Sequence, residues 1–226
     1  MNEDLVTVIY FWKIKQSKVG FALLRMALDR SALRRFSGVR FAKMLGTGKG
    51  ETFTPRDADA TRWGALVVIE SAQLTSLDNS KLVKRWRKNS VDEVRYLVDP
   101  ISSHGLWAKT NPFDYRKSAS DGEVVAITRA RIKWAENFRF WKAVPPVTSS
   151  LHSSPGLLNT IGIGEAPIGL QGTFSVWESG TALRDFAYKN APHRVAIENT
   201  AKYDWYSEEL FARFELINTA DFDYVH

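Results

Sequence analysis

The chain has 226 residues, and 31 Lys and Arg residues against 25 Asp and Glu residues give it a formal charge of +6. Hydrophobic residues make up 44% and aromatic residues 12% of the sequence, which excludes a disordered chain because so many large apolar groups can be buried. The chain has no cysteine, which excludes a disulfide scaffold, a thiolate metal site and a cysteine nucleophile.

The first half of the chain alternates predicted strands with predicted helices. Runs of β-branched and aromatic residues indicate strands, and apolar residues at helical spacing indicate helices. Asp78 or Asn79 is a suitable N-cap for the second helix. In chain order the expected elements are a strand at 6–12, a helix at 17–36, a glycine-rich segment at 45–55, a strand at 62–70, a helix ending near 88 and a strand at 91–98.

The second half repeats this order. Two of its strings, Ile161-Gly-Ile-Gly and Thr173-Phe-Ser-Val-Trp-Glu-Ser, correspond to Leu45-Gly-Thr-Gly and Ala65-Leu-Val-Val-Ile-Glu-Ser at similar spacing. The expected elements are a strand at 124–130, a helix at 134–144, a strand at 170–177, helices at 181–189 and from 191, and a strand at 210–217.

The repeat predicts an α+β fold made of two tandem ferredoxin-like β-α-β-β-α-β units. Each unit leaves one sheet face uncovered, so we expect the two to pack sheet to sheet as a dimeric α/β barrel-like fold within one chain. The polar stretch 109–122 places the boundary between residues 1–115 and residues 116–226. The alternative is a chance similarity of short glycine-containing strings.

The glycine segments do not have the spacing of a phosphate-binding loop or of a dinucleotide fingerprint. In an extended segment Gly46 and Gly48 point to one face, and so do Gly162 and Gly164. Such a bare face leaves room for a flat group, or for another backbone, to approach closely. β-Bulges or turns are the alternative interpretation.

One of the four histidines has a distinctive context. Asn190 and Pro192 indicate a helix start, and His193 then shares a face with Ile197 and Ala201. The helix dipole disfavours a protonated ring there, so the neutral imidazole keeps a lone pair for a metal or for acid–base chemistry. A single imidazole is what a haem iron needs from a protein, whereas a hydrogen-bonded core histidine is the alternative.

Several strings resemble the spheroidene monooxygenase family of carotenoid biosynthesis, from about residue 6 to residue 217. The most specific is Ile161-Gly-Ile-Gly-Glu followed by Thr173-Phe-Ser-Val-Trp, supported by Gly46-Thr-Gly-Lys-Gly, Pro192-His-Arg-Val-Ala-Ile and Trp205-Tyr-Ser-Glu-Glu-Leu-Phe. The resemblance implies a dimeric α+β barrel fold and a haem b-dependent oxygenase that converts a carotenoid methylene to a ketone with dioxygen. It assigns the haem iron to His193.

We expect the barrel interior to form the haem pocket, with Gly46, Gly48, Gly162 and Gly164 admitting the porphyrin. Rings from Trp12, Trp63, Phe174 and Trp177 are expected to contribute to the lining. Arg213 on the last strand is the candidate for the polar group on the oxygen side, with a surface salt bridge as its alternative role. The chain carries no flavin or nicotinamide motif, so an external electron donor such as ferredoxin is expected. Residues 111–121 match nothing in this scheme.

Two other functions remain open from the sequence. One is a cofactor-free small-molecule oxygenase on the same barrel, with His193 as a general base. The other is a non-catalytic haem or lipid carrier.

The basic residues cluster in two stretches, at 25–40 and at 81–88. Interspersed acidic residues favour a solvated helix face over nucleic-acid binding. A basic amphipathic helix also suits peripheral contact with an anionic membrane, where a carotenoid substrate would be found. The acidic N-terminus and the absence of a long apolar segment predict a cytoplasmic protein. A homodimer is a further expectation.

Overall fold

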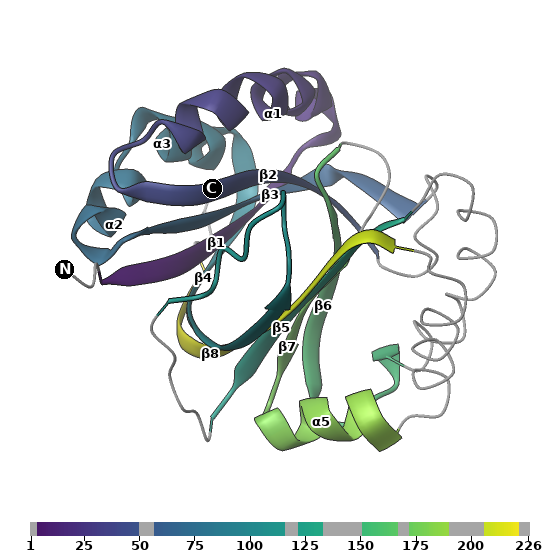
Figure 1. The fold of residues 1–226 in the computed structure, drawn as a ribbon. Helices are drawn as coiled ribbons and strands as arrows, with labels where there is room; N and C mark the ends of the chain where they lie inside the picture. The colour runs from purple at the N-terminus through teal and green to yellow at the C-terminus, as the bar shows by residue number, and fades with distance from the viewer. Residues whose placement is uncertain are drawn as a thin grey trace.

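A computed structural model describes residues 4–49, 57–115, 122–132, 151–166, 172–189 and 206–221. Its core is a closed barrel of eight antiparallel strands with helices packed outside it (Figure 1). The fold is therefore α+β, as the sequence predicts. No helix in the described part of the chain is long and apolar enough to cross a membrane.

The described part of the first half contains the strands and helices that the sequence predicts, whereas residues 50–55 of the expected glycine-rich segment lie outside the described residues. In chain order the elements are β1 (Leu5–Ile14), a short 3-10 turn (Gln16–Lys18), α1 (Val19–Arg34), β2 (Val39–Gly48), β3 (Ala58–Glu70), α2 (Ser71–Asp78), α3 (Lys81–Asn89) and β4 (Ser90–Gly105). The predicted N-cap is wrong by one or two residues. Ser80 caps α3, since its hydroxyl accepts a hydrogen bond from the Val83 backbone N–H at 3.2 Å. Asp78 instead accepts hydrogen bonds from Arg95 and Tyr10.

The described part of the second half has four strands and one long helix. These are β5 (Val124–Ile132), β6 (Leu157–Gly164), β7 (Gly172–Trp177), α5 (Gly180–Lys189) and β8 (Tyr206–Asp221). The expected helix at 181–189 is thus confirmed, whereas the expected helices at 134–144 and from 191 lie outside the described residues.

The strands follow the same order in both halves. The barrel runs β1-β3-β2-β6-β7-β5-β8-β4, so the first half is ordered β4-β1-β3-β2 and the second β8-β5-β7-β6. Ladders between β2 and β6 and between β4 and β8 join the halves at both edges. The two sheets therefore do more than pack face to face: hydrogen bonds between their edge strands join them into one closed barrel wall. The equivalence of the two halves as tandem units, and the boundary at 115/116, stay predictions.

Alternate side chains of each strand point to opposite faces of the barrel wall. In β1, Ile9 and Phe11 point inward and belong to one buried cluster that fills the barrel. Tyr10 and Trp12 point outward and pack under the helices of the first half. The wall therefore has an inner and an outer face, and both faces are buried over much of their area.

Candidate functional site

The two glycine segments lie side by side and form the junction between β2 and β6. Gly46 pairs with Gly164, Gly48 pairs with Gly162, and Thr47 between them pairs with Ile163. Ile163 belongs to the cluster inside the barrel, so the glycines occupy outward positions on both strands. The bare face predicted from the sequence is therefore continuous across the junction, and it lies on the outer face of the barrel.

Small residues continue this bare face onto the neighbouring strands. Gly162 pairs with Thr173 of β7, and Thr173 pairs with Thr128 of β5. In the adjacent row Ser175 lies between Thr160 and Ala126. We refer to the outward residues Gly162, Gly164, Thr173, Ser175, Ala126 and Thr128 as the small-residue patch.

The corresponding outer face of the first half is filled with large side chains. Tyr10, Trp12, Met44 and Trp63 are all buried there under the helices. The two halves thus share a strand order but differ in what their outer faces can accommodate. The outward side chains of the patch are small, whereas those at the corresponding positions of the first half are mostly large rings.

One polar atom beside the patch has an unmet hydrogen-bonding capacity. The hydroxyl oxygen of Thr160 is buried and has no hydrogen-bond partner among the described residues. Its neighbour Ser175 accepts a hydrogen bond from the indole N–H of Trp177 at 2.9 Å. A buried hydroxyl without a partner is costly, and a group bound at the patch would find the Thr160 hydroxyl available for a hydrogen bond.

Arg213 lies on the same outer face. It pairs with Ala126 of β5 on one side and with Ser102 of β4 on the other. Its Nε donates a hydrogen bond to the Ser102 hydroxyl at 3.0 Å. This bond orients the half-buried guanidinium in the row that contains Ser175 and Thr160, so the structure brings Arg213 onto the face of the glycines.

Among the described residues, apolar side chains fill much of the barrel interior, where the sequence predicts the haem pocket. Phe174 points inward, where its ring packs at 5.1 Å from that of Phe11 and at 4.9 Å from that of Tyr96. It belongs to a cluster of buried apolar side chains from all eight strands. Phe174 is therefore a core residue, on the opposite face of its strand from the small-residue patch.

The tryptophans expected in the lining also occupy other positions. Trp12 and Trp63 pack under the helices of the first half. Trp177 points outward at the end of β7, where it packs against Leu183 and Phe186 of α5. Trp177 thus borders the small-residue patch. Trp12 and Trp63 lie on β1 and β3, which belong to the first half and do not neighbour the strands of the patch.

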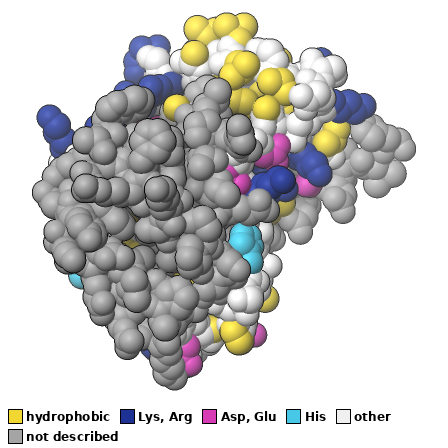
Figure 2. Space-filling model, turned by 90° about the vertical axis from the view of Figure 1, so that its right-hand side faces the viewer, with side chains coloured by type: hydrophobic (Ala, Val, Ile, Leu, Met, Phe, Trp, Pro, Cys, Tyr) yellow, Lys and Arg dark blue, Asp and Glu magenta, His cyan; other side chains and the backbone are white. Residues whose placement is uncertain are grey.

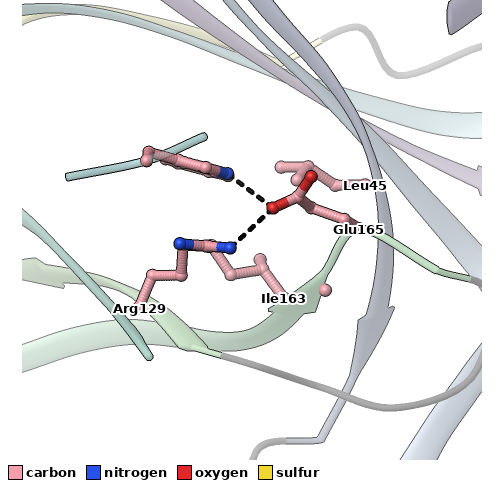
Figure 3. A pocket seen from close by; sticks show the side chains of 6 residues that line it. Leu45, Arg129, Ile163 and Glu165 are labelled. Carbon is pink, nitrogen blue, oxygen red and sulfur yellow. Dashed lines mark hydrogen bonds and ion pairs between the residues drawn. The ribbon is translucent and has the colours of Figure 1, made fainter. Parts of the chain in front are cut away.

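A buried ionic cluster lies beside the glycine junction, at a hollow with about 170 Å³ of empty space, part of it open to solvent (Figure 3). Its centre is Glu165, the residue after Gly164. Glu165 receives Lys43 Nζ at 2.5 Å, the Trp107 indole N–H at 2.7 Å and Arg129 Nη2 at 2.9 Å. Lys43 comes from the first half and Arg129 from the second, so the cluster joins the halves.

The charges of this cluster are mutually compensated. Burial works to raise the pKa of Glu165, but hydrogen bonds and charges from Lys43, Trp107 and Arg129 outweigh it and hold that pKa below its ordinary value. Arg129, which is 2% exposed, also forms an ion pair with Glu208. Glu208 accepts backbone N–H bonds from Ala108 and Lys109, and its pKa is lowered as well.

The sequence analysis missed this cluster. One signal was present, because Lys43 interrupts the inward series of Phe41 and Leu45 in β2. Nothing in the sequence indicated that its partner would be Glu165. The hollow beside these side chains has essentially no space that even a water molecule could occupy, so we treat the cluster as a structural support of the glycine junction.

His193, which the sequence predicts as the haem-iron ligand, lies outside the described residues. Within the described ranges, no three His, Asp or Glu side chains gather closely enough to hold a metal ion.

The chain has curated relatives with which it shares about a third of its residues. It is 34% identical over 209 residues to a spheroidene monooxygenase of Rhodobacter capsulatus, covering 90% of this chain and 86% of that protein. It is 36% identical to one of Rubrivivax gelatinosus, covering 78% and 68%. With one of Cereibacter sphaeroides it shares 31% identity, spanning 88% of this chain and 62% of the relative. No family model matches the chain.

Two solved structures share the fold. A crystal structure of an aldoxime dehydratase in complex with butyraldoxime superposes with a TM-score of 0.58 at 10% identity, covering 95% of this chain and 79% of that one. Another aldoxime dehydratase structure gives 0.57 at 10% identity, covering 94% and 81%. At this identity the similarity concerns the architecture alone.

Proposed function

The chain belongs to the spheroidene monooxygenase family and is a monooxygenase, and from this premise we propose that it uses haem b, dioxygen and an external electron donor to oxidise an apolar, carotenoid-like substrate. The donor would be a separate protein such as ferredoxin. The single observation that carries the haem assignment is the small-residue patch. This outer face without large side chains lies in the second half of the chain, which also contains His193.

The residues of this face suit a flat macrocycle with polar edges. Gly162 and Gly164 present no side chain, and a strand face without side chains is suited to close approach by a planar group. Thr160 offers a buried hydroxyl that has no partner among the described residues. Trp177 and Ala126 are buried and apolar, and such residues exclude water from a binding site. These residues support the proposal that the patch binds the group implied by the family resemblance.

Each proposed role belongs to a specific residue. His193 would hold the iron as its protein ligand, and the haem would supply the centre that binds and activates dioxygen. Arg213, oriented by Ser102, would place a positive charge and hydrogen-bond donors on the same face. Gly46 and Gly48 would extend the bare surface across the junction to β2.

The shared strand order of the two halves supports a related proposal about the fold. We propose that they are two tandem ferredoxin-like units, of which the second has kept small outward residues to make room for the cofactor. The large outward rings of the first half then explain why one site serves the whole barrel.

The optical spectrum tests the haem assignment. Protein expressed with haem supply should show a Soret band that shifts on reduction with dithionite and on addition of carbon monoxide. His193→Ala should weaken or abolish that band, because it removes the proposed iron ligand. The matched control is His152→Ala, since this histidine is exposed and lies before β6, outside the strands that form the patch.

Colourless protein that does not respond to added hemin would refute the haem assignment and favour a cofactor-free oxygenase. A Soret band without substrate turnover, when reduced donor and oxygen are present, would identify a haem carrier instead.

A further inference from the structure

Helix α1 carries a ridge of leucines that faces solvent. Leu24 and Leu28 are 58% and 53% exposed and lie one turn apart, and Leu23 beside them is 43% exposed. The opposite side of the helix is buried through Ala22, Met26 and Leu33, so α1 is already anchored on the barrel by other residues. We call Leu23, Leu24 and Leu28 the α1 ridge.

Basic residues surround the α1 ridge. Between Lys13 and Arg40 the chain has eight Lys and Arg residues and a single acidic residue, Asp29. Asp29 is buried and forms ion pairs with Arg25 and Arg85, so it contributes little negative charge to the surface. Figure 2 shows hydrophobic side chains gathered at the top of the molecule, where Figure 1 places α1, with Lys and Arg side chains to either side.

The exposed basic residues lie at both ends of the helix. Lys15 and Lys18 precede it, Arg34 ends it and Arg35 follows it, and all four are exposed. Arg30 lies within the last turns and is half exposed. A convex apolar ridge with positive charges at both ends is complementary to an anionic lipid surface, which takes leucines at the acyl boundary and basic groups at the phosphates.

The α1 ridge and the glycine junction lie on different sides of α1. Arg30, two residues after Leu28, lies 3.9 Å from Glu165, which directly follows Gly164. Side chains two residues apart on a helix do not face each other, so Arg30 turns toward the junction while Leu28 faces solvent. Membrane contact through the ridge therefore does not rest on the proposed function.

We propose that the α1 ridge docks this protein on anionic membranes: Leu23, Leu24 and Leu28 enter the acyl boundary while Lys15, Lys18, Arg34 and Arg35 contact headgroup phosphates. The occupant of this surface is a lipid bilayer and not a protein groove, because the ridge protrudes and its charges are of one sign.

Vesicle co-sedimentation of the full-length protein tests this docking. The protein should sediment with phosphatidylcholine vesicles that contain phosphatidylglycerol, bind pure phosphatidylcholine vesicles weakly, and be released in part by high salt. The double variant Leu24→Ser/Leu28→Ser should bind at least tenfold more weakly, since it removes the inserted side chains. Arg34→Gln/Arg35→Gln should bind more weakly at low salt only.

The matched control is Leu158→Ser on β6, because Leu158 is equally exposed at 54% but is not part of the ridge. It should bind vesicles as the parent protein does. Circular dichroism should show that all variants are folded, since every substituted side chain is exposed.

Three results would overturn the proposal: no binding of the parent protein to anionic vesicles at low salt, undiminished binding of the leucine double variant, or a protein dimer that this variant dissociates in the absence of any vesicle binding. None of these measurements involves haem or turnover. Membrane docking can therefore be refuted while the proposed function holds, and the proposed function can be refuted while membrane docking holds.

Discussion

At the scale of single residues, the buried charges beside the glycine junction are stable because each has a partner. Lys43 is 5% exposed and Arg129 is 2% exposed, and an unpaired charge in such a position would be prohibitively expensive. Both pair with Glu165, whose carboxylate also accepts the Trp107 indole hydrogen bond. Removing this carboxylate therefore leaves Lys43 without its carboxylate partner and Arg129 with Glu208 alone.

Glu165→Gln should destabilise the protein by about 3 kcal/mol at pH 7, the range found when one partner of a buried ion pair is removed. The pKa of Glu165 is lowered in the folded protein, so its contribution is complete above its ordinary pKa and is lost as the pH falls through the lowered value. The difference between variant and parent should therefore shrink in acid. Urea unfolding from pH 7 down to pH 3 measures it.

The control for this experiment is Glu70→Gln. Glu70 pairs with Arg40 at 3.1 Å, but both side chains are largely accessible to water, so its loss should cost less than about 1 kcal/mol. A loss at Glu165 no larger than the loss at Glu70, or one independent of pH, would contradict the role of the buried cluster.

At the scale of elements, β6 and its neighbours differ from the strands of the first half by the size of their outward residues. Gly162 and Gly164 of β6 alternate with Ile161 and Ile163, which fill the barrel. A strand with one apolar face and one bare face is unusual in a buried wall, because glycine weakens a strand and contributes nothing to packing. We expect the glycines of β6 to serve binding, because the absence of side chains leaves space for a ligand on the outer face of the strand.

Gly162→Val should therefore lower the affinity for hemin at least tenfold, because it places a branched side chain on the small-residue patch. Valine suits an extended strand, so the circular dichroism spectrum should be retained. Hemin titration followed at the Soret band gives the affinity. Gly20→Ala on α1 is the control, since nothing lies within 4 Å of the position of its added Cβ atom. Equal hemin binding by the two variants would place the cofactor elsewhere.

At the scale of the whole molecule, the barrel closes only when both halves are present. β2 and β4 are the edges of the first half, and each finds its ladder partner in the second, β6 and β8 respectively. The inner cluster likewise combines residues of both halves, such as Ile9 and Phe11 with Phe174 and Phe214. Neither half buries its inner face alone.

A fragment of residues 1–115 should therefore self-associate instead of remaining a folded monomer. It exposes the inner face of its sheet and two unpaired edges, which favour pairing with a second copy. Size-exclusion chromatography with light scattering measures its state, with the full chain as reference. A monomeric fragment with cooperative thermal unfolding would show that the first half is independently stable.

The sequence determined most of the described elements and their order, although it did not predict α2. The apolar run at 6–12, the helical spacing at 17–36 and the recurring Gly-X-Gly strings were sufficient to predict a barrel-forming α+β fold and the family. They were also sufficient to select Gly46, Gly48, Gly162 and Gly164 as positions where a surface is bare, because the absence of a side chain is a local property of the residue.

Only the tertiary structure decided which face of the wall each residue takes. Both faces of β1 and β7 are buried, so hydrophobic alternation, which separates a buried face from a solvated one, carries no signal there. Phe174 and Trp177 were therefore indistinguishable in sequence, although one fills the barrel and the other borders the small-residue patch. Likewise Lys43 and Glu165 lie far apart in the chain and meet only because closure of the barrel brings β2 beside β6.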